Sequence, residues 1–104
     1  MPSDFEKQFD AAMMDIYHRA RTEAKYKATR YLRMLGQHGG LETARILLHS
    51  TTVSEGYTAL WERGRLDLTV EAMILGQPQW HQLFSADDLE IARRRLREYD
   101  YESV

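Results

Sequence analysis

The chain has 104 residues, of which 43% are hydrophobic and 29% are charged, with a formal net charge of -2 and no cysteine. This size and composition exclude a disordered tail and predict one folded domain over residues 1–104. The absence of cysteine excludes disulfides, thiolate metal sites and a cysteine nucleophile. The small negative net charge argues against a protein whose main role is to bind a polyanion.

A long amphipathic helix is predicted from about Asp4. Ser3 and Glu6 form a capping-box pattern, in which the hydroxyl and the carboxylate each satisfy an amide of the first turn. Apolar residues then recur at spacings of three and four, which places them on one helical face. They are Phe5, Phe9, Ala12, Met13, Ile16, Tyr17 and Ala20.

The next stretch allows two interpretations. The apolar face can be continued through residues 24–35 without a glycine or proline, so one long helix up to Gly36 is open. We prefer a break, because residues 25–27 offer no clear apolar position and Thr29 could cap a second helix. Residues 36–40 contain three glycines, each of which costs a helix about 1 kcal/mol, and this predicts a connection in which one glycine serves as a left-handed C-cap.

Two short helices are expected after this turn. Apolar residues at helical spacing between 41 and 48 predict the first, and the polar, β-branched residues 50–53 end it. Ser54 is the predicted N-cap of the second, and Gly64 is placed to end it. A helix-turn-helix interpretation of this pair is geometrically permissible, but its recognition helix would bring two glutamates to a groove lined with phosphates.

The last third of the chain is predicted to hold two more helices and a short turn. Asp67 can cap a helix that ends before Pro78, and the apolar cluster around Trp80 fits one helical turn. Ser85 and Asp88 repeat the capping pattern and open the final helix. Because no stretch alternates apolar and polar residues with period two, the expected fold is an all-α, compact single-domain bundle of five or six short helices.

Recognisable reaction motifs are missing. There is no pattern for a nucleophilic serine or a phosphate loop, and the four histidines lie too far apart in sequence for a helical metal pair, so no catalytic residue, metal or cofactor is expected. Asp67 and Glu71 share a helical face and could support acid and base chemistry. Both also suit the start of a helix, and the sequence is predicted not to encode an enzyme.

A basic stretch is the better candidate for binding nucleic acid. Its cations could contact phosphates while the ring of Tyr26 stacks on a base. A charged run on an amphipathic helix is, however, usually its solvated face. The candidate residues are Arg19, Lys25, Tyr26, Lys27, Arg30 and Arg33.

Aromatic residues supply a candidate protein interface. Trp61 and Phe84 stand where core residues are expected, whereas Tyr57 and Trp80 lie beside loops and are expected to be surface anchors. The leading hypothesis is therefore a helical protein-interaction or regulatory module, whose partner is another protein or a second copy of this chain. A DNA- or RNA-binding accessory protein is the alternative.

The expected location is the cytoplasm, without membrane contact. The start of the chain is polar and acidic where a secretory signal would be basic and then apolar. No apolar run approaches the roughly 20 residues that span a bilayer.

Several segments resemble a family of short, uncharacterised bacterial proteins. The resemblance rests on GGL at 39–41, SEGY at 54–57, GRLDLTVE at 64–71 and LFS at 83–85, with the apolar residues around them, and covers about two thirds of the chain. It implies a bacterial cytosolic protein that occurs alone or beside other domains. It brings no activity and no site residues.

Overall fold

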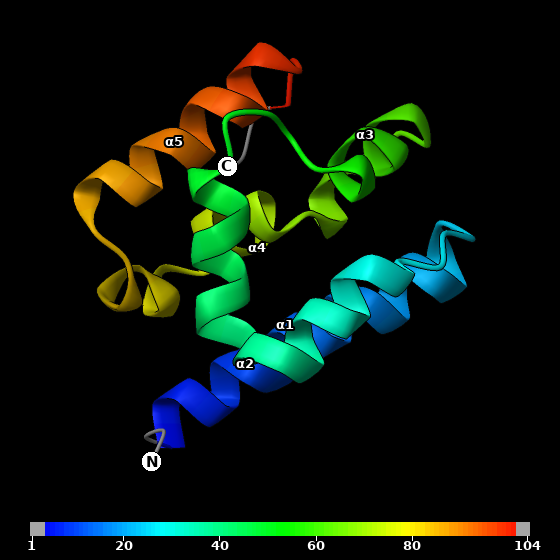
Figure 1. Ribbon diagram of the computed structural model, residues 1–104. Helices are drawn as coiled ribbons and strands as arrows, with labels where there is room; N and C mark the ends of the chain where they lie inside the picture. Colours follow the sequence, from blue (N-terminus) through cyan, green and yellow to red (C-terminus); the bar gives the residue numbers. More distant parts are fainter. Residues whose placement is uncertain (1–3, 102–104) are drawn as a thin grey trace.

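The computed structural model describes residues 4–101, which form five α-helices and two short 3-10 helices without a strand (Figure 1). The predicted all-α bundle is confirmed. In chain order the elements are α1 (Asp4–Glu23), α2 (Thr29–His49), α3 (Glu55–Glu62), η1 (Leu66–Leu68), α4 (Val70–Gly76), η2 (Pro78–Leu83) and α5 (Ala86–Glu98). None of these helices has both the length and the apolar character needed to cross a membrane.

Helix α1 buries the face that its spacing predicts, including Phe9, Met13 and Ile16. It begins at Asp4, although the cap expected at Ser3 lies outside the described residues. The preferred break is also confirmed, because α1 ends at Glu23 and α2 begins after residues 24–28. Thr29 is not the cap, however: the chain enters α2 through Ala28, which is buried and has no side-chain acceptor.

The break expected at residues 36–40 is present, but it is confined to a kink at Gly39, where two helical segments of α2 meet. Gly39 takes the positive φ of 79° that glycine tolerates, and helix continues on both sides of it. The Gly40 amide then donates a 2.7 Å hydrogen bond to Asp10 Oδ1 on α1. The first half of α2 therefore lies along α1, and its second half turns away toward α5 (Figure 1).

The other helix ends follow local chemistry with one exception. Ser54 caps α3, and Ser85 and Asp88 form the predicted capping box of α5. Asp67 does not cap α4, because it lies within η1 and binds Arg65. Thr69 takes the cap position instead, since its backbone is extended and its hydroxyl accepts from the Ala72 amide.

Three aromatic residues occupy environments opposite to those expected. Trp80 is only 5% exposed, because η2 folds back over α1 and brings its ring against Phe9 at 5.3 Å. Tyr57 is 2% exposed because it faces α5, and its hydroxyl donates to the Arg95 carbonyl oxygen. Trp61, expected in the core, is 47% exposed. Surface anchors at Tyr57 and Trp80 are therefore a wrong prediction, whereas Phe84 is buried as expected.

Candidate functional site

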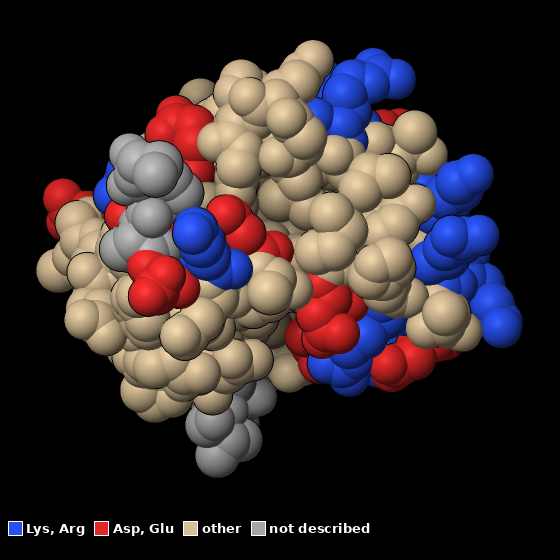
Figure 2. Space-filling model, turned by 90° about the horizontal axis from the view of Figure 1, so that it is seen from below, with Lys and Arg blue, Asp and Glu red and all other residues tan. Residues whose placement is uncertain are grey.

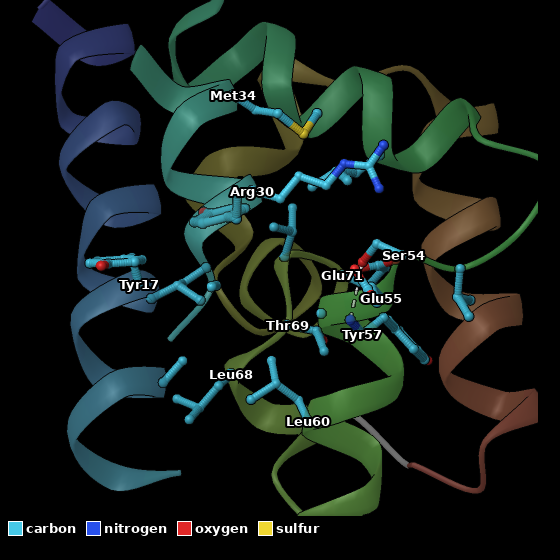
Figure 3. A pocket seen from close by; sticks show the side chains of 18 of the residues that line it. Tyr17, Arg30, Met34, Ser54, Glu55, Tyr57, Leu60, Leu68, Thr69 and Glu71 are labelled. Carbon is cyan, nitrogen blue, oxygen red and sulfur yellow. Dashed lines mark hydrogen bonds between the residues drawn. The ribbon is translucent and has the colours of Figure 1, made fainter. Parts of the chain in front are cut away.

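A pocket of about 370 Å³ opens between the α1–α2 pair and the α3–α4 segment (Figure 3). This volume lies within the range of small-molecule sites, which are concave and mostly apolar. Its apolar walls come from all four helices and from η1. They include Ile16, Met34, Ile46, Leu60, Leu68 and Val70.

Glu71 lines this pocket but is buried and already paired. Its carboxylate lies 3.2 Å from the Arg95 guanidinium, and both side chains are at most one-tenth exposed. Arg95 also donates to the carbonyl oxygens of Leu47 and Ser50 at the end of α2. Burial raises the pKa of Glu71, and the residue's own amide and Arg95 oppose that shift. The pair thus joins α2, α4 and α5.

The hydroxyls of two tyrosines that line the pocket are engaged as well. Tyr31 donates a 2.8 Å hydrogen bond to the Met13 carbonyl oxygen, and Tyr57 donates to the Arg95 carbonyl oxygen at 3.0 Å. Burial raises the pKa of both tyrosines, and the negative charge of Glu71 adds to the effect. Both phenols therefore remain protonated donors across the physiological range, and neither offers a free reactive oxygen.

Arg30 and Glu55 are the exposed charged residues at the pocket rim. Among residues 4–101 neither makes a hydrogen bond or an ion pair. Figure 3 shows the Arg30 side chain running along the edge of the pocket from α2. Glu55 begins α3, where a carboxylate is favoured by the positive end of the helix. Arg30 has no comparable structural reason for its charge.

The comparisons with known proteins give this site no precedent. No protein-family model, curated protein or solved structure matches the chain.

The predicted basic stretch does not form one continuous face. The break after α1 divides it, and Arg19 is bound to Glu23 at 2.8 Å. Hydrogen bonds from Arg19 and Arg65 lower the pKa of Glu23 to about 2. The ring of Tyr26 lies under the Arg63 guanidinium, 5.0 Å from its centre, so that face is covered. The remaining candidates Lys25, Lys27, Arg30 and Arg33 are exposed.

The other candidate groups are separated or engaged. Asp67 and Glu71 do not share a helical face, because η1 and α4 are distinct elements and Asp67 is held by Arg65 at 3.0 Å. His49 is paired with Asp88 at 2.7 Å. Within residues 4–101 no three side chains of His, Asp or Glu are grouped to hold a metal ion.

Arg95 is the structural residue that sequence reasoning missed. A signal for it exists in α5, since Arg95 lies three or four positions from Ala92, Ile91 and Tyr99. An arginine at that spacing lies beside the apolar face of its own helix. A basic side chain beside the apolar face of its helix is as consistent with a buried ion-pair partner as with exposure to solvent.

Proposed function

We propose that this protein is a regulatory helical module of the bacterial cytosol that binds a small, largely apolar molecule. The pocket between the α1–α2 pair and the α3–α4 segment carries the proposal, because its size and its apolar walls suit such a ligand. Its inward polar groups at Glu71, Tyr31 and Tyr57 are each bonded to the protein. That arrangement supports binding without chemistry.

The burial of the two expected interface anchors also favours a small ligand over a protein partner. Tyr57 and Trp80 belong to hydrophobic clusters of the fold and cannot insert into another protein. A small molecule in the pocket, in contrast, would contact α1, α2, α3 and α4 together. Its binding would stabilise their arrangement by an amount that grows with the ligand concentration, which is how a ligand can act on a regulatory module.

The test is a titration with neutral apolar probes, followed by nuclear magnetic resonance of methyl groups. Octanol, indole and cyclohexylmethanol are suitable probes. Saturable shifts are expected for Ile46, Leu60 and Val70, which line the pocket. If no probe shifts these methyl groups, or if the shifts are scattered over the whole surface, the proposal is wrong.

A matched pair of glycine variants distinguishes probe binding in the pocket from non-specific binding elsewhere on the surface. Gly56 lines the pocket, and a Cβ built on it would lie 3.7 Å from Tyr26, in ordinary contact. Gly56→Ala should therefore narrow the pocket and weaken probe binding without a steric clash. Gly76→Ala is the control, because a Cβ there meets nothing within 4 Å and the residue is not part of the lining.

Binding of DNA or RNA is a second candidate, favoured by a charged surface. Figure 2 shows Lys and Arg side chains gathered at one end of the molecule, on the side where α1 ends in Figure 1. Lys25 and Lys27 lie in the connection after α1 and are exposed. Lys25→Glu with Lys27→Glu should abolish binding of a single-stranded oligonucleotide, and the wild-type affinity should fall steeply with salt. Unchanged affinity in the double variant would remove this candidate.

A further inference from the structure

Arg30 places an unpaired positive charge beside an apolar cavity. It lies in the first turn of α2 and forms part of the pocket lining. No acidic residue stands in that turn, and among the described residues Arg30 makes no ion pair or hydrogen bond. A cation near the positive end of a helix is electrostatically unfavourable, so the fold itself gives Arg30 no compensation.

Two carboxylates also line the pocket, but neither offers a competing cation site. Glu55 begins α3, where the positive end of that helix favours its negative charge. Glu71 is paired with Arg95 and cannot take a second cation without losing that partner. The tyrosine rings do not form a cage for a cation either, since Tyr57 is directed to α5 and Tyr26 is covered by Arg63. The pocket is thus better suited to an anion than to a cation.

The pocket has a charged residue at one end and apolar residues at the other. In Figure 3 Arg30 lies at one end of the cavity, and Leu60 and Leu68 lie at the other. We propose that the ligand is a small amphipathic carboxylate, whose acid group binds Arg30 and whose aliphatic body fills the space toward Leu60 and Leu68. This inference rests on the proposed function and names its ligand class.

Geometry and exposure set the expected size of the effect. A guanidinium can bind a carboxylate through two parallel hydrogen bonds. Because Arg30 is exposed, the contact is screened by water, and it should contribute about fivefold in affinity, the upper end for exposed ion pairs. Most of the affinity should come from the aliphatic body in the cavity.

Octanoate and octanol provide a matched pair of probes, because they share the aliphatic chain and differ in the charge of the head group. Calorimetric titration of the full chain should show octanoate binding about fivefold tighter than octanol, with the difference shrinking as salt is raised. Arg30→Gln should remove this preference, so that octanoate binds no more tightly than octanol. Arg33→Gln, an exposed arginine on the same helix that does not line the pocket, should leave both affinities unchanged.

The outcomes distinguish the two proposals. If neither probe binds, the proposed ligand-binding function is wrong and this inference falls with it. If both probes bind equally well to the wild type, the pocket function stands and the anionic ligand is refuted. If Arg33→Gln reduces the octanoate preference as much as Arg30→Gln does, general surface charge is responsible and the assignment to Arg30 is overturned.

Discussion

Replacing Gly40 by alanine should destabilise the protein by about 2 kcal/mol. The added Cβ would lie 2.6 Å from Asp10 Oδ1 and 3.0 Å from the backbone Cα of Asp10. Because a backbone atom cannot swing aside, α1 and α2 would have to separate, at an overpacking cost of ~1–3 kcal/mol. The separation would also weaken the Gly40 amide hydrogen bond, worth ~1 kcal/mol, whereas alanine regains only ~0.5–1 kcal/mol in a helix.

Gly36→Ala is the matched control, and it should have the opposite sign. Gly36 lies on the same helix and is exposed, and a Cβ added there would meet nothing within 4 Å. The substitution should therefore stabilise the protein by ~0.4–1 kcal/mol through the unfolded chain. Urea denaturation followed by far-ultraviolet circular dichroism measures both effects. If Gly40→Ala is as stable as the wild type, or if both variants shift in the same direction, the close approach of α1 and α2 is refuted.

Three further predictions test the buried ion pair, the core and a surface ion pair by the same denaturation assay. Arg95→Met should lower the free energy of unfolding by roughly 3–5 kcal/mol, because it leaves the buried Glu71 carboxylate without its partner. Arg94→Met, at an exposed position, should leave it almost unchanged. Trp80→Ala should cost ~3–5 kcal/mol and Trp61→Ala less than about 1 kcal/mol; equal losses would contradict their different burial. The pKa of Glu23 is lowered from 4.5 to about 2, so its stabilisation is present above pH 4.5 and is lost as the pH falls toward 2. Glu23→Gln should flatten that acid limb of the stability profile.

The helices were predictable because their ends depend on a few neighbouring residues. Ser54 and the Ser85–Asp88 pair cap their helices through bonds that span three residues, and these bonds form wherever the chain begins a helix there. Asp67 failed as a predicted cap because Thr69, two residues later, is equally able to accept an amide. The choice between them depends on the preceding η1 turn, which packs Leu68 into the core. Local chemistry thus predicts a cap to within about a turn, and packing selects the residue.

Burial of the aromatic residues was not predictable from their position beside turns. Trp61 and Trp80 both lie in short helical segments, yet only Trp80 reaches the core. The difference arises because η2 returns across α1, where Phe5 and Phe9 receive the indole ring. Such a return is a long-range contact, and no short sequence pattern specifies it.

A pocket is harder to predict than a core, because it lies where apolar faces approach without closing. The faces of α1 and α2 were readable from their spacing, but the gap between them and α4 depends on the kink at Gly39 and on the pair formed by Arg95. The unpaired charge of Arg30 beside the pocket, in contrast, could be recognised in the sequence. Arg30 stands at the start of a helix with no acidic residue three or four positions away, so neither its helix nor a neighbour compensates it. An arginine in that situation is free to bind the acid group of a ligand, and the octanoate titration tests directly whether it does.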